Sequence, residues 1–70
     1  MIIYRSYAEI VDSNGNVKII ELLWDNYDKV MEYFFSLKDY SRCRLVEVWK
    51  LRCQPDHVFK DIYCIAKYIV

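Results

Sequence analysis

Residues 25–40 read DNYDKVMEYFFSLKDY, the clearest periodic pattern in the chain. Its apolar residues recur every three or four positions, as on the buried face of an amphipathic helix. They are Tyr27, Val30, Met31, Phe34 and Leu37. Asp25 is the expected N-cap, and Asp28 takes the place of a capping-box acid. The stretch predicts a central amphipathic helix, around which we expect the other elements to be arranged.

The opposite side of this predicted helix is polar and mostly acidic. It carries Asp25, Asp28, Lys29, Glu32, Ser36 and Asp39. Asp28 and Glu32 repel each other at a spacing of four residues, and Asp39 lies near the helix C-terminus, where negative charge is unfavourable. An ordinary solvent-exposed face explains the pattern, and so does a strip that docks onto a basic groove. Our candidate partner-binding residues are Asp28, Glu32 and Asp39, with the aromatic residues Tyr33 and Tyr40 beside them.

An N-terminal β-hairpin is predicted on the N-terminal side of the helix. Asn14-Gly15 lies between two runs rich in strand-forming residues, residues 2–12 and 17–24, as in a two-residue type I′ turn. That loop would place Ala8 opposite Glu21. One face would then hold Tyr4, Ser6, Ala8, Ile10, Ile19 and Leu23, and the other Ile3, Tyr7, Val11, Ile20, Leu22 and Trp24. Apolar residues on both faces indicate that both are covered, one of them by another molecule.

Residues 41–53 alternate with a period of two, which predicts a third strand. One side carries Cys43, Leu45, Trp49 and Leu51, and the other carries Val46 and Val48 between basic residues. The basic residues, a candidate nucleic-acid-binding surface, are Arg42, Arg44, Lys50 and Arg52. Strands that display arginines bind single-stranded nucleic acid in several folds. Charges that protect an exposed sheet edge give the same pattern.

Residues 57–70 fit two kinds of secondary structure. Their apolar residues segregate completely onto one helical face, and Pro55 and Asp56 suit a helix start. Their valine, isoleucine, tyrosine and phenylalanine residues favour a strand. We predict a C-terminal helix, and therefore an α+β fold of order ββαβα, with a C-terminal strand (ββαββ) as the alternative.

Composition describes a small, neutral domain. Seventy residues allow a single domain, residues 1–70, and 56% hydrophobic residues exclude a disordered chain. Ten basic and ten acidic residues give a net charge of zero, so no bulk attraction to nucleic acid or membranes follows. We expect a cytoplasmic protein with reduced thiols, because no secretory signal is recognisable and the three cysteines are an odd number. No apolar run is long enough to span a membrane.

No catalytic or metal-binding motif is recognisable. The spacing of Cys43, Cys53, His57 and Cys64 contains no C-x-x-C pair, and a Cys53–His57 dyad lacks an orienting acid and oxyanion donors with any specificity. Gly15 is the only glycine, so no glycine-rich phosphate loop exists. We expect no enzyme activity, no cofactor and no metal.

Three functional hypotheses follow. In size and layout the chain looks like the small inhibitors that phages and mobile elements encode against host enzymes or defence systems, anti-CRISPR proteins among them. The first hypothesis is such a protein-binding module, which uses the acidic helix face. The second is a nucleic-acid-binding module that uses the basic strand face. The third is a homodimer in which each copy covers the open sheet face of the other.

Overall fold

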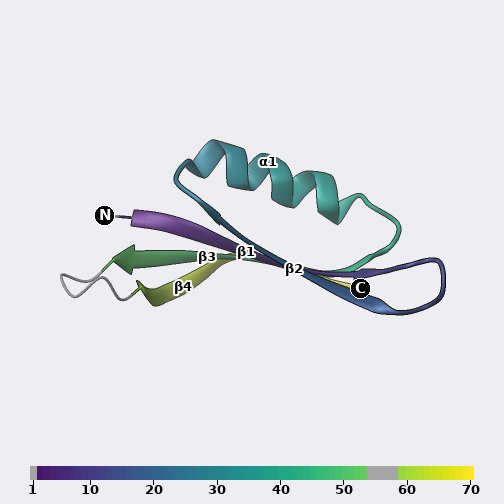
Figure 1. Ribbon diagram of the computed structural model, residues 1–70. Helices are drawn as coiled ribbons and strands as arrows, with labels where there is room; N and C mark the ends of the chain where they lie inside the picture. The colour runs from purple at the N-terminus through teal and green to yellow at the C-terminus, as the bar shows by residue number, and fades with distance from the viewer. Residues whose placement is uncertain (1, 54–58) are drawn as a thin grey trace.

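Four strands and one helix make up the described part of the chain, residues 2–53 and 59–70 of a computed structural model. In order they are β1 (Ile2–Val11), β2 (Val17–Trp24), α1 (Tyr27–Lys38), β3 (Cys43–Cys53) and β4 (Phe59–Ile69). The strands form one antiparallel sheet in the order β2-β1-β3-β4, and α1 lies across one face of it (Figure 1). The predicted α+β fold and N-terminal hairpin are confirmed.

The predicted C-terminal helix is wrong, and the alternative strand is what the structure contains. β4 pairs with β3 along its length, from Phe59 opposite Cys53 to Ile69 opposite Leu45. β-branched and aromatic side chains pack favourably on a sheet beside a neighbouring strand. This stabilisation by tertiary contacts outweighs the helical periodicity of the segment. Residues 57 and 58 of the predicted helix lie outside the described residues.

The hairpin loop is one residue longer than predicted. The Asp12 N–H donates to the Asn16 carbonyl at 2.8 Å, which closes a three-residue loop with Gly15 at a φ of 82°. The Asp12 carboxylate fixes this loop by accepting hydrogen bonds from the backbone N–H groups of Asn14 and Asn16, both at 2.9 Å. A loop of this kind, a turn followed by a glycine in the left-handed region, is the usual alternative to the two-residue loop.

The longer loop shifts the register of β2 by one residue and turns its side chains over. Ala8 pairs with Ile20, and Tyr4 with Trp24, so that Ile20, Leu22 and Trp24 share the helix-covered face of the sheet. The predicted faces of β2 are therefore exchanged, whereas those of β1 are correct. Trp24 uses this position to donate a hydrogen bond from Nε1 to the hydroxyl of the fully buried Ser6, at 2.9 Å.

Helix α1 begins one residue later than its predicted cap. Asn26, in an extended conformation, is the N-cap, and its side chain accepts a hydrogen bond from the Lys29 N–H at 3.0 Å. The assignment of Asp25 as the N-cap is therefore wrong. Both residue types cap well, and only the exact turn of the chain after β2 decides between them. Lys38, in the last turn, complements the helix dipole.

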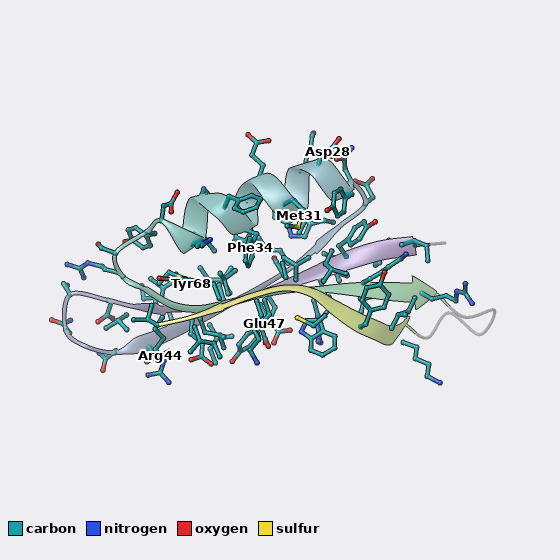
Figure 2. All side chains as sticks on the ribbon, turned by 180° about the vertical axis from the view of Figure 1, so that it is seen from behind. Asp28, Met31, Phe34, Arg44, Glu47 and Tyr68 are labelled. Atoms are coloured by element: carbon teal, nitrogen blue, oxygen red, sulfur yellow. The ribbon has the colours of Figure 1, made fainter. Side chains whose placement is uncertain are left out.

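The core lies between α1 and the middle of the sheet. Val30 and Phe34 of α1 are buried, as predicted, and they pack on small or branched residues of the sheet. These sheet residues are Ala8, Cys43, Val46 and Val48. Figure 2 shows Phe34 between α1 and the sheet. Met31 and Leu37 pack against the edges of this cluster. Helix α1 contacts mainly β3, with fewer contacts to β1 and β2. No helix of the described residues covers the sheet face away from α1, although Ile3 and Leu51, which pair with each other on that face, are buried.

A bulge changes the predicted faces of β3. Glu9 pairs with Leu45 but Ile10 pairs with Cys43, so Arg44 is an extra residue on the β3 side. Cys43 consequently joins the helix-side core, which contradicts the prediction that it shares a face with Leu45. Arg44 turns to the other face, away from α1, where its Nε donates to the Glu9 carboxylate at 2.9 Å (Figure 2).

Two adjacent phenylalanines of α1 test this packing. Phe34→Ala should lower the free energy of unfolding by about 3 kcal/mol or more, because it leaves a cavity above the sheet. Phe35→Ala should lower it by about 1 kcal/mol or less, because Phe35 is 54% exposed and its ring contacts Phe34 only edge-on. Urea unfolding followed by circular dichroism measures both. Equal losses in the two variants would contradict the observed orientation of the helix.

The cap of α1 provides a second comparison. Asn26→Ala should cost about 1 kcal/mol of stability, because the Lys29 N–H loses its acceptor. Asp25→Ala keeps that hydrogen bond and should cost less than about half as much. Thermal unfolding of the two variants measures the difference. A larger loss of stability in Asp25→Ala than in Asn26→Ala would contradict Asn26 as the N-cap and support Asp25 instead.

Candidate functional site

The three candidate acids lie on the outer side of α1 and at its C-terminal end. Asp28, Glu32 and Asp39 are all solvent-exposed, and their carboxylates form no ion pair with the described part of the chain. At a rise of about 1.5 Å per residue, the strip from Asp28 to Asp39 extends over about 16 Å. Such a strip can meet a row of basic side chains on another molecule.

The two candidate tyrosines occupy different environments. Tyr33 is half-buried against Trp24, with 5.0 Å between the ring centroids, and burial raises the pKa of its hydroxyl. Tyr40, just after the helix, is exposed. Phe35 was not among the candidates, although it is 54% exposed on the helix surface. The sequence alone does not indicate whether an apolar residue at this position is buried or exposed. The packing of α1 on the sheet determines that Phe35 is exposed.

A shallow groove runs between α1 and β2. It has a volume of about 370 Å³, and its lining residues are Trp24, Lys29, Glu32, Tyr33 and Ser36. The structure thus brings Glu32 and Tyr33 together, two of the five predicted binding residues. Asp28, Asp39 and Tyr40 lie outside the groove.

The four candidate basic residues do not form one surface. Arg44 faces away from α1, whereas Val46 and Val48, the two valines expected on the same side of the strand, are buried beneath the helix. Arg44 and Arg52 are eight positions apart, about 26 Å along a strand. The Lys50 ammonium lies 5.7 Å from the centre of the Tyr63 ring, within reach of a cation–π contact.

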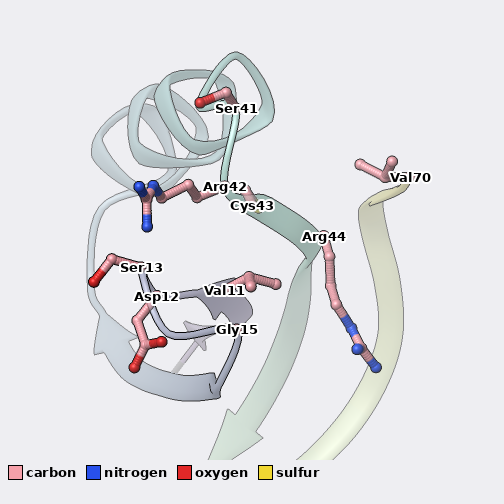
Figure 3. Close-up of a pocket in the computed structure, with 9 residues that line it drawn as sticks. All are labelled: Val11, Asp12, Ser13, Gly15, Ser41, Arg42, Cys43, Arg44 and Val70. Carbon is pink, nitrogen blue, oxygen red and sulfur yellow. The ribbon is translucent and has the colours of Figure 1, made fainter.

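A pocket of about 410 Å³ lies beside the hairpin loop (Figure 3). Its lining residues are Val11, Asp12, Ser13, Gly15, Ser41, Arg42, Cys43, Arg44 and Val70. The side chains of Arg42 and Arg44 extend in different directions (Figure 3). The Asp12 carboxylate accepts from the backbone of the loop, so its hydrogen bonds are structural.

Ionisable groups on the sheet face away from α1 largely compensate one another. The Tyr7 hydroxyl donates to Glu9 at 2.8 Å, and Lys67 pairs with Glu47 at 3.3 Å. The hydrogen bond to Glu9 raises the pKa of Tyr7, and burial and the nearby carboxylates of Glu9, Glu21 and Glu47 add to the effect. The Tyr7 hydroxyl therefore stays protonated and remains a hydrogen-bond donor to Glu9.

The cysteines do not assemble a reactive site within the described residues. Cys43 is buried in the core and burial raises the pKa of its thiol, which lowers the thiolate fraction. Cys64 is half-buried and donates to the Ala66 carbonyl. His57 and the Cys53 side chain, needed for the hypothetical dyad, lie outside what the structure describes. Among the described residues, no three histidine, cysteine or acidic side chains are grouped to hold a metal.

Large apolar side chains are exposed on both edge strands. On β2 they are Val17, Ile19, Ile20, Leu22 and Leu23, and on β4 they are Ile62, Tyr63 and Ile69. The β2 residues belong to both faces of the sheet. The sequence indicated that both faces of the hairpin are apolar, but it did not indicate that β2 is an edge strand.

Comparisons with known proteins add no function. No protein-family model matches this chain, and no curated protein or solved structure is significantly similar to it. Within the described residues, no helix has the length and apolar character needed to cross a membrane. Surface chemistry is therefore the basis for a functional proposal.

The two described thiols should differ in reactivity. In a Cys53→Ser background, Cys43 should react with a thiol reagent on the order of tenfold more slowly than Cys64, because it is 2% exposed and its pKa is raised. Mass spectrometry of labelled peptides measures both rates, and labelling in denaturant provides the control. Faster labelling of Cys43 would contradict its place in the core.

Proposed function

We propose that this chain is a non-enzymatic protein-binding module, which covers a basic surface of another protein with the outer side of α1. The observation that carries the proposal is the combination of exposed aromatic side chains and unpaired carboxylates on one helix. Phe35 is more than half exposed, and the exposed residues Asp28, Glu32 and Asp39 have no cationic partner among the described residues. Both groups are left available for another molecule.

Charge complementarity indicates the chemistry of the partner. The net charge of the chain is zero, so attraction to a partner must come from local patterning. A helix that presents three separated carboxylates complements a row of arginine or lysine side chains. Such complementarity speeds association and weakens as salt screens the charges. Binding should therefore be salt-sensitive although the protein as a whole is neutral.

Aromatic residues supply the apolar part of the contact. Tyrosine and other aromatic side chains offer large rigid areas and dominate many interface hot spots. Phe35 and Tyr40 lie towards the C-terminal half of the acidic strip, and Tyr33 and Glu32 border the groove beside β2. We expect the partner to place an apolar group against Phe35 and basic groups around it.

The biological setting that we propose is inhibition of a host enzyme or defence system by a phage or a mobile element, in the cytoplasm. Its basis is the small size of the chain and the expectation that it works by occupying a surface. The nucleic-acid alternative has less geometric support, because its four basic residues do not share one surface. Arg44 lies on the sheet face away from α1, Lys50 and Arg52 pair with Tyr4 and Ile2 and so lie on the α1 side, and Arg42 lies in the turn before β3.

The test is affinity capture from a bacterial lysate with a neutralised variant as the comparison. Asp28→Asn, Glu32→Gln and Asp39→Asn together remove the three charges without adding new ones. The wild type should retain a specific protein with a basic surface, and the variant should lose it by about tenfold or more. Retention should also fall when the salt concentration rises.

A control variant separates the acidic strip from net charge. Ser13→Lys, Asn14→Lys and Asn16→Lys add the same three units of charge at exposed positions in the hairpin loop, outside α1 and the residues that follow it. The control should retain the protein that the neutralised variant loses, and circular dichroism should show that both are folded. Loss in both variants, or in neither, would contradict docking through α1.

A further inference from the structure

The outer edge of β2 has the properties of a pairing surface. β2 is an edge strand of the sheet. Among the described strands it pairs only with β1, through eight successive positions without a register shift. Its apolar side chains are exposed on both faces, with Ile20 at 38% and Leu23 at 60%. A long, regular and apolar edge is a template for another strand, and natural proteins usually protect such edges.

The other edge of the sheet is protected, which makes the exposure of β2 distinctive. β4 pairs with β3 through two register shifts, one between Val48 and Trp49 and one between Lys50 and Leu51. It also carries the exposed lysines Lys60 and Lys67. Bulges and lysines are the devices that prevent edge-to-edge pairing. β2 has neither a bulge nor a proline, and it has one lysine.

The outer edge of β2 presents backbone N–H and C=O groups that can bond to another strand. The hydrogen bond from the Asp12 N–H to the Asn16 carbonyl makes this pair a hydrogen-bonded one. Because such pairs alternate along an antiparallel ladder, Lys18, Ile20 and Leu22 direct their backbone groups towards β1. The N–H and C=O groups that point outward therefore belong to Val17, Ile19, Glu21 and Leu23.

We propose that a second copy of this chain occupies the edge, through antiparallel pairing of β2 with β2 about a twofold axis. The pairing would extend the sheet to eight strands, with both helices on one face. Outward-facing residues must meet outward-facing residues, which restricts the register. Centred on Ile20, the pairing uses the whole stretch Val17–Leu23 and forms about eight backbone hydrogen bonds, two for each hydrogen-bonded pair.

Charge and apolar contacts favour the register centred on Ile20. A register centred on Lys18 or Glu21 would oppose two like charges, which is unfavourable. In the register centred on Ile20, Val17 faces Leu23 of the second copy and Ile20 faces its own counterpart. The chain is neutral, so the two copies do not repel each other as wholes. This edge is separate from the outer side of α1, and the inference is independent of the proposed function.

The register makes a rescue experiment available. Ile20→Lys places two lysines opposite each other on the twofold axis and should weaken dimerisation by about 100-fold. Ile20→Glu should do the same. An equimolar mixture of the two variants opposes lysine to glutamate and should restore a dimer, which native mass spectrometry identifies as one copy of each variant.

A matched substitution on the other edge serves as the control. Ile62 on β4 is 42% exposed, close to Ile20 at 38%, so Ile62→Lys adds the same charge at a similar exposure. It should leave the dimer intact in sedimentation velocity. Ile19→Pro provides a second disruptive variant, because the N–H it removes points away from β1 and is not part of the β1–β2 ladder. It should give a folded monomer.

Three results would overturn the proposal. The first is a wild type that is monomeric at about 100 µM, well above the dissociation constant expected of a specific dimer. The second is a dimer that persists in both Ile20→Lys and Ile19→Pro. The third is a failure of the mixed Ile20→Lys and Ile20→Glu variants to associate. None of them affects the capture test, which depends on α1.

Discussion

The packing of Phe34 and Val30 against the middle of the sheet is the contact on which the rest of the structure depends. It is possible because β1 offers Ser6 and Ala8 where the helix crosses, and because their small side chains allow a close approach. The hydroxyl of Ser6 accepts from Trp24, which ties the end of β2 to the same core. One helix covers the centre of the sheet, so the edge strands contribute only partly buried side chains, Trp24 of β2 and Ala66 and Tyr68 of β4 among them, to the border of the core.

This arrangement leaves large apolar side chains exposed on both edge strands and on α1. The two edges deal with this exposure differently. β4 is irregular and carries lysines, whereas β2 is regular and apolar. Helix α1 adds a third kind of surface, acidic with exposed aromatic residues. A small domain gains stability from a partner more readily than from its own limited core. Both proposals therefore assign the unused surfaces of the chain to other protein molecules.

Much of the fold could be predicted from local patterns, and the errors have identifiable physical causes. The period of α1, the Asn-Gly turn and the alternation of β3 are local features, and each predicted the correct element. The register of β2 was missed because the Asp12 carboxylate stabilises a longer loop than Asn-Gly alone suggests. The place of Arg44 depends on a bulge, which sequence alternation does not contain. β4 satisfies both a helical and a strand pattern, and only its pairing with β3 decides between them.

For the candidate site, exposure of Asp28 and Glu32 could be predicted, but the contact between Tyr33 and Trp24 could not.

Hydrogen exchange of the β2 amides, measured residue by residue at several protein concentrations, tests most directly whether this edge is a pairing surface. The amides of Lys18, Ile20 and Leu22 bond to β1 in a single copy and should be protected at every concentration. Those of Val17, Ile19, Glu21 and Leu23 point outward and should become protected only as the concentration rises. Protection of the second group that increases with concentration is the predicted result. Fast exchange of these four amides at every concentration would contradict it.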